Sequence, residues 1–111
     1  MASFRILLAV IFVGIAGYTA VTIANHGMNL MPVFFGDMAE MAWPGQFNFD
    51  FMCMLLLSGL WVSWRHEFSP AGLALGLVAV FGGASFLSAY LLIVTSKEKD
   101  VRVLLLGPGR A

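Results

Sequence analysis

Asp50 is the residue with the clearest chemical potential, because its carboxylate adjoins a long apolar segment. It follows Asn48 and Phe49 and precedes an apolar run that ends at Trp64. A carboxylate within a membrane-spanning helix can relay protons, bind a cation or act as an acid on a substrate, and it is a functional candidate by default. The structural alternative is that Asn48 caps the helix. Asp50 would then lie in the first turn, where the helix dipole stabilises a carboxylate.

Three more polar residues, His26, Asp37 and Glu40, are expected at the same membrane face as Asp50. Together such groups could make a hard-cation or proton site. The alternative is that Asp37 and Glu40 form only the solvated face of a short helix. The single cysteine, Cys53, excludes an intramolecular disulfide and a cysteine-based zinc or iron–sulfur site within one chain.

Methionines recur around the same part of the sequence, at positions 28, 31, 38, 41, 52 and 54. Thioether sulfur selects Cu(I), but methionine at helical spacing more often forms an adaptable packing face. His26 and His66 end different apolar segments, which argues against a haem held by two histidines of one chain. The sequence therefore predicts no catalytic residue, no metal ligand set and no cofactor.

The composition defines the class of protein. Of 111 residues, 60% are hydrophobic and 11% are charged, with six basic and six acidic side chains, and the mean hydropathy is +0.91. Soluble domains carry roughly a quarter charged residues. A disordered chain, a nucleic-acid-binding protein and an ordinary soluble domain are therefore excluded. The chain is expected to be an integral membrane protein, with the lipid bilayer as its surroundings.

Three apolar segments, at about 6–24, 48–64 and 71–95, are long enough to cross a bilayer. A spanning helix needs about 20 residues, and in lipid its backbone must be hydrogen-bonded within the segment. We expect an all-α, three-helix bundle forming one domain over residues 1–111. The first segment is too long for the apolar core of a cleaved signal peptide, about 7–15 residues.

The segments between and after the spans are expected to lie at the membrane surface. Residues 30–42 predict a short amphipathic interfacial helix, and residues 96–111 a polar and then amphipathic tail. Three spans would place the N-terminus with the Arg65 loop, and the acidic connection with the tail. Arg5 before the first span favours a cytoplasmic N-terminus; the basic residues of the tail favour the reverse, and a near-balanced charge bias would permit both. Trp43, Trp61, Trp64 and Arg65 stand at span ends and are predicted interface anchors; the alternative is that they bind a lipid headgroup or a pigment.

Small residues form two helix faces. Gly14 and Gly17 lie in the first span, and the third carries a helix-packing face. That face consists of Gly72, Gly76, Ala79 and Gly83. Small residues let helices approach closely in lipid. We expect one face, on the third span, to pack against another subunit; the alternative is that both faces close the monomer.

An ordered set of residues resembles the domain-of-unknown-function 2834 family of small bacterial membrane proteins. The matching pieces are Asn25-His26-Gly27-Met28-Asn29-Leu30, Phe34-Phe35, Phe49-Asp50, Ser58, Trp61, Arg65, Gly83, Ser85, Leu87 and Tyr90-Leu91-Leu92. The similarity covers roughly residues 6 to 95. It implies a three-span protein of the bacterial inner membrane and supplies no catalytic residue.

The function expected from these features is that of a non-enzymatic helix-packing subunit. It would dock on a larger membrane complex or on a second copy of itself. One alternative is a homo-oligomeric small transporter or channel, in which symmetry supplies the polar groups that one chain lacks. A less favoured alternative is a membrane enzyme with Asp50 as its acid, because such sites need several convergent polar groups.

Overall fold

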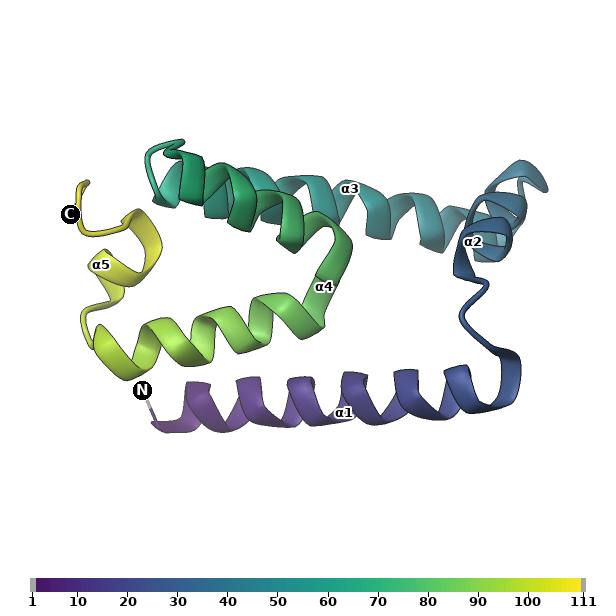
Figure 1. Ribbon diagram of the computed structural model, residues 1–111, viewed down its shortest axis with the longest axis horizontal. Helices are drawn as coiled ribbons and strands as arrows, with labels where there is room; N and C mark the ends of the chain where they lie inside the picture. The colour runs from purple at the N-terminus through teal and green to yellow at the C-terminus, as the bar shows by residue number, and fades with distance from the viewer. Residues whose placement is uncertain (1, 111) are drawn as a thin grey trace.

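The computed structural model describes residues 2–110, and this part of the chain is helical without strands (Figure 1). The helices are α1 (Ala2–His26), α2 (Leu30–Ala39), α3 (Trp43–Arg65), α4 (Pro70–Lys97) and α5 (Val101–Leu106). Three of them, α1, α3 and α4, are long and apolar enough by length and composition to cross a membrane. The all-α class and the three apolar helices are therefore confirmed. Met1 and Ala111, the ends of the predicted domain, lie outside the described residues.

Two predicted boundaries differ from the structure around the turn between α2 and α3. The predicted helix over 30–42 ends at Ala39, and Met41 has a φ of 59°. Pro44 lies in the first turn of α3 rather than in a helix stop, because its fixed φ and missing N–H suit that position. As α3 begins five residues before the predicted start, Asn48 is not its cap and Asp50 is not in its first turn.

The apolar segment 70–97 does not form one straight helix. At Gly83 the backbone has φ 58° and ψ −141°, a combination that is close to exclusive to glycine. In Figure 1 the chain reverses there, and the first arm (residues 70–82) and the second arm (residues 84–97) form a V whose open side faces the end of the molecule that holds α5. At 1.5 Å per residue each arm is about 20 Å long. The apolar helix predicted over 71–95 is thus present but broken at Gly83 into a helical hairpin.

Side chains of α3 and of α4 itself support the reversal. Gly83 is buried, and a β-carbon there would lie 3.2 Å from Phe51 Cζ and 3.4 Å from Leu55 Cδ2. At the break, the Ser85 hydroxyl donates a hydrogen bond to the Gly82 carbonyl at 2.7 Å. The backbone at the break thus has a side-chain hydrogen-bond partner. Apolar surroundings would not supply such a partner.

The first arm packs on the C-terminal half of α3 through glycines. A β-carbon on Gly76 would lie 2.8 Å from the Gly59 carbonyl oxygen and would collide with the Ser63 hydroxyl. The whole predicted packing face is buried inside the chain. It comprises Gly72, Gly76, Ala79 and Gly83. The expectation that this face meets another subunit is therefore wrong. The face packs within the monomer, which is the alternative that the sequence left open.

The second arm packs against the beginning of α1. Leu8 is the one residue of α1 classed as buried, and Arg5 Nη2 donates to the Leu92 carbonyl at 3.3 Å. A small core of Val62, Ala79 and Tyr90 lies between α3 and the two arms. From residue 9 to residue 33 every side chain is exposed. In Figure 1 the second arm lies beside the first half of α1, and the C-terminal half of α1 extends beyond the hairpin.

The two ends of the 44 Å long molecule differ in charge. The basic end, on the left in Figure 1, holds the start of α1, the end of α3, both ends of α4, and α5. All six Lys and Arg residues lie there: Arg5, Arg65, Lys97, Lys99, Arg102 and Arg110. The acidic end holds α2 with the adjoining ends of α1 and α3, and its charged residues are Asp37, Glu40 and Asp50.

This arrangement corrects the expected position of the tail. The start of α1 and the Arg65 loop lie at one end of the molecule, and the acidic connection lies at the other. The tail was expected beside the acidic connection, but it lies at the basic end. The reason is the reversal at Gly83, which returns the chain to the end from which α4 started.

Replacing Gly83 by alanine tests the reversal. Gly83→Ala is expected to destabilise the fold by about 1–3 kcal/mol, because alanine is strained at this φ and ψ and its β-carbon meets Phe51. Unfolding of the purified protein in detergent, followed by circular dichroism, measures the change. Gly14→Ala is the matched control: it lies in a helix with open space around it, so no loss of stability is expected. Equal stability of both variants and the parent would contradict the hairpin.

Candidate functional site

Asp50 lies on an exposed part of α3, beside a pocket of about 670 Å³ between α2 and α3. It is the one charged residue of the lining. The lining residues are Met38, Met41, Ala42, Gly45, Gln46, Phe49, Asp50 and Cys53. The pocket thus joins a single carboxylate to apolar and sulfur-containing side chains. It does not assemble the several convergent polar groups that acid–base chemistry needs.

The predicted polar cluster is found at one end of the molecule but is not assembled into one site. His26 and Glu40 are exposed at the ends of α1 and α2, whereas Asp37 is half-buried. Asn48 Nδ2 donates to the Phe34 carbonyl at 3.1 Å and reaches the Asp37 carboxylate at 3.5 Å. Among residues 2–110, no three His, Cys, Asp or Glu side chains are grouped closely enough to hold a metal ion. Asn48 and Asp37 instead fasten α2 to α3.

Arg65, a predicted interface anchor, is buried inside the protein and only 4% exposed. Its Nε donates to the Leu104 carbonyl at 2.7 Å, and its Nη2 to the Val103 carbonyl at 3.4 Å. Its Nη1 donates to the Tyr90 hydroxyl at 3.1 Å. These acceptors are two carbonyls from the last turn of α5 and a phenol, so none carries a full charge. The expected outward-facing role of Arg65 is corrected to a contact with the tail.

The neighbouring tryptophans hold the same tail. Trp61 Nε1 donates to the Leu105 carbonyl at 3.0 Å. Arg110 Nε donates to the Trp64 carbonyl at 3.2 Å, and its guanidinium stacks over the Trp64 ring with 4.5 Å between carbon and centroid. Trp43 alone among the predicted anchors is highly exposed, at 73%, with its ring beside Phe47. The tail is therefore bound to the end of α3.

Tyr90 connects this contact to the core. Its ring stacks on Phe86 and meets the edges of the Trp61 and His66 rings. Its hydroxyl lies 2.6 Å from His66 Nε2. Because the hydroxyl accepts from Arg65, its own proton is available to His66 Nε2, which fits a neutral imidazole protonated on Nδ1. Burial lowers the pKa of His66, and the adjacent Arg65 charge lowers the pKa further. The sequence resemblance included Tyr90 without giving it a role.

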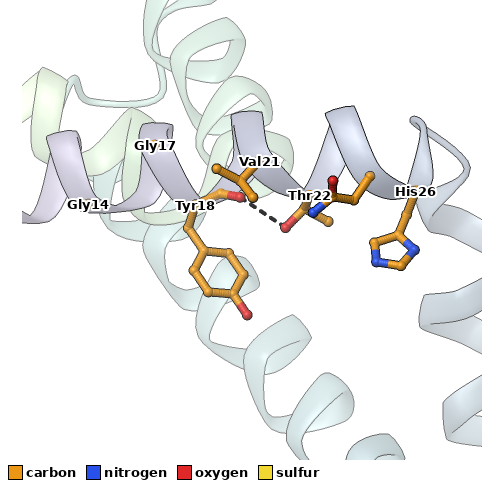
Figure 2. Close-up of a pocket in the computed structure, with 7 residues that line it drawn as sticks. Gly14, Gly17, Tyr18, Val21, Thr22 and His26 are labelled. Carbon is orange, nitrogen blue, oxygen red and sulfur yellow. Dashed lines mark hydrogen bonds between the residues drawn. The ribbon is translucent and has the colours of Figure 1, made fainter.

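A second surface lies on α1, along its exposed C-terminal half. Figure 2 shows the side chains of Tyr18, Thr22 and His26 projecting from one side of the helix. A groove of about 450 Å³ runs along this side. It is lined by Gly14, Gly17, Tyr18, Val21, Thr22, Asn25 and His26. The Thr22 hydroxyl donates to the Tyr18 carbonyl at 2.9 Å. The spacing of three and four residues could have revealed this polar stripe from the sequence.

No protein-family model, curated protein or solved structure matches this chain. Membership of the domain-of-unknown-function 2834 family therefore stays a prediction. The two surfaces, the α1 groove and the Arg65 contact with the tail, are interpreted from their own chemistry.

The His66 geometry predicts a pH dependence of stability. Because the pKa of His66 is lower in the folded chain, the unfolded chain binds more protons between the two pKa values. Stability is then complete above the ordinary histidine pKa of about 6.5 and falls as the pH drops below it. Unfolding in detergent between about pH 8 and pH 5 measures this effect. His66→Gln should remove the dependence, and His26→Gln, at the exposed histidine, should keep it. A dependence that survives in His66→Gln would contradict the assignment.

Proposed function

We propose that this chain is an integral membrane protein that binds a helix of another membrane protein through the groove on α1. The observation that carries the proposal is the exposure of the C-terminal half of α1. Every side chain from residue 9 to residue 33 is exposed, although this stretch combines glycines with polar groups. Helices associate in lipid through small residues that allow close approach and through polar groups that hydrogen-bond across the contact.

Helix lengths support a membrane arrangement with two full spans. At 1.5 Å per residue, α1 and α3 are about 37 and 35 Å long, and the hydrocarbon core is about 30 Å thick. The arms of α4 are too short to cross it, so α4 enters and returns as a re-entrant hairpin. Non-helical backbone is tolerated at that depth where protein buries it, and Gly83 is buried.

The distribution of charge supports one orientation. Basic residues favour the cytoplasmic side, and all six lie at the basic end. Both the N-terminus and the tail are then cytoplasmic, and α2 lies at the opposite surface as an interfacial helix. In a bacterial inner membrane, which the family resemblance implies, that surface is the periplasmic one. The near-balanced distribution of Lys and Arg expected for three spans does not arise, because the hairpin in α4 returns the tail to the end that holds Arg5 and Arg65.

The chemistry of the groove favours a helical partner over lipid alone. The Tyr18 side chain is 79% exposed, and its hydroxyl is a donor within an apolar helix. A hydroxyl in a medium without partners costs free energy, and a hydrogen bond from a neighbouring helix removes that cost. Gly14 and Gly17 have no atom within 4 Å of an added β-carbon, so a partner backbone has room to approach.

A homo-oligomeric transporter or channel is the second candidate, favoured by the reversal at Gly83. Broken helices whose half-helix ends lie at mid-membrane are typical of transporters. Here the break packs against Phe51 and Leu55 of the same chain, so a path would need further copies. An enzyme using Asp50 ranks below both, since Asp50 is alone in an apolar pocket.

Reporter fusions test the membrane arrangement. Green fluorescent protein fused to the tail is expected to fluoresce, and alkaline phosphatase at the same place is expected to be inactive, because the tail is cytoplasmic. Alkaline phosphatase inserted after Asn29, at the acidic end, is expected to be active and serves as the matched control. An active phosphatase at the tail would mean that α4 crosses the membrane.

Substitutions on opposite faces of α1 test the partner contact. Gly17→Ile fills the groove, whereas Ala16→Ile places the same side chain about 100° away around the helix axis and outside the groove lining. The native mass and composition of tagged protein, extracted gently from its host, give the readout. We expect a stoichiometric membrane partner that is retained in Ala16→Ile and lost at least about tenfold in Gly17→Ile, as for a contact worth about 1.4 kcal/mol. A monomer without a partner, or equal loss in both variants, would overturn the proposal.

A further inference from the structure

We propose that Arg65, Trp61 and Tyr90 form a phosphate-binding site, that the chain's own tail covers it, and that the headgroup phosphate of an anionic phospholipid displaces the tail. This site shares no residue with the α1 groove, so it stands or falls independently of the proposed partner, although it rests on the proposed membrane orientation.

The first argument is the charge of Arg65. The residue is 4% exposed, and the three acceptors of its guanidinium are two peptide carbonyls and a phenol. Removing a cation from water is costly, and an anion with well-placed oxygens offsets that cost better than neutral groups do. The carbonyls at the end of α5 supply only the partial negative charge of a helix C-terminus. Hydrogen bonds from a guanidinium to a phosphate are charge-assisted, and so are stronger than those to carbonyls.

The second argument is the convergence of donors. Arg65 Nη2, Arg65 Nε and Trp61 Nε1 bind the carbonyls of three consecutive residues, 103, 104 and 105. Three N–H groups from one end of α3 therefore point at one short stretch of the tail. A phosphate, with several oxygens in a small volume, can take the place of these carbonyls. Tyr90 holds the remaining side of the guanidinium through Nη1.

The third argument is position. The donors lie at the basic end, which meets the cytoplasmic headgroups in the proposed orientation. Basic pockets between helices on that side suit anionic headgroups. The Glu67 carboxylate lies against Gly109, and none of the hydrogen-bond acceptors of Arg65 is a carboxylate. Arg65 is therefore not already paired with an acid through these hydrogen bonds.

The cover itself is small and depends on backbone contacts. α5 has six residues, of which Leu104 is buried. Gly107, with φ 87°, follows it and lies so close that a β-carbon would collide with the Arg65 carbonyl. A short segment held by its carbonyls, one buried leucine and the exposed contacts of Arg110 with Trp64 can exchange with a ligand more readily than a long packed helix.

The experiment follows the tail by tryptophan quenching. A quencher on Pro108→Cys, in a Cys53→Ser background, lies near Trp61 and Trp64 while the tail is bound. The protein is placed in phosphatidylcholine vesicles, in vesicles with added phosphatidylglycerol, and in phosphatidylcholine vesicles with inorganic phosphate. We expect the tryptophan emission to recover only in the vesicles that contain phosphatidylglycerol, because release of the tail moves the quencher away from Trp61 and Trp64. Native mass spectrometry is expected to show phosphatidylglycerol retained on the protein.

Matched variants separate the site from the general surface charge. Arg65→Gln is expected to weaken phosphatidylglycerol retention about tenfold or more, since it removes a charge-assisted contact. Trp61→Phe removes one donor and keeps the ring, so a smaller loss is expected if Arg65→Gln does not fold. Arg102→Gln removes one exposed charge at the same end and is expected to retain the lipid as the parent does.

Three results would overturn the proposal. One is a tail that stays bound in every vesicle, which makes the contact purely structural. Another is release by phosphatidylglycerol that is equal in the parent, Arg65→Gln and Trp61→Phe, which reports surface charge alone. The last is release by inorganic phosphate without phosphatidylglycerol, which makes free phosphate the ligand in place of the lipid.

Discussion

The backbone conformation of Gly83 is the constraint on which the rest of the structure depends. A positive φ with an extended ψ is available to glycine and strained for other residues, and it reverses α4 in the middle of an apolar segment. The reversal brings Tyr90 next to Arg65 and His66, which a straight helix would carry far away. It also returns the tail and its four basic residues to the end of the molecule that holds Arg5.

α3 is the element that the first arm of α4, the turn at Gly83, α2 and the tail all contact. Its C-terminal half receives the first arm through Gly59 and Gly76, and its middle supports the turn through Phe51. Its last residues bind the tail, and Asn48 near its start fastens α2. α1 is the exception, because it rests on the second arm near Leu8 and then leaves the bundle. Because α1 is held at one end only, it is the helix whose exposed face would bind the proposed partner.

The sequence predicted the helices well and their connections poorly, for physical reasons. Membrane-type helices are found by counting apolar residues, so α1 and α3 were predictable. Hydropathy carries no information on φ, and nothing in it separates Gly83 from Gly76, so the reversal was missed. Arg65 at a span end looks like an anchor; it is buried because a tail from 40 residues later returns to it. The small-residue face was recognised, but spacing cannot tell an internal partner from an external one.

The proposed site at Arg65 follows from the small number of charged residues in this chain. A protein with few charged residues places one guanidinium out of solvent and offers it carbonyls where an anion would bind more strongly. In the proposal, this contact holds the tail while no ligand is present and gives way to a phosphate that binds Arg65 more strongly. Leu104 and the close approach of Gly107 keep the tail in register with Arg65. Binding of a headgroup phosphate would therefore shift the tail from its bound to its released position, since the phosphate and the tail compete for the same three donors.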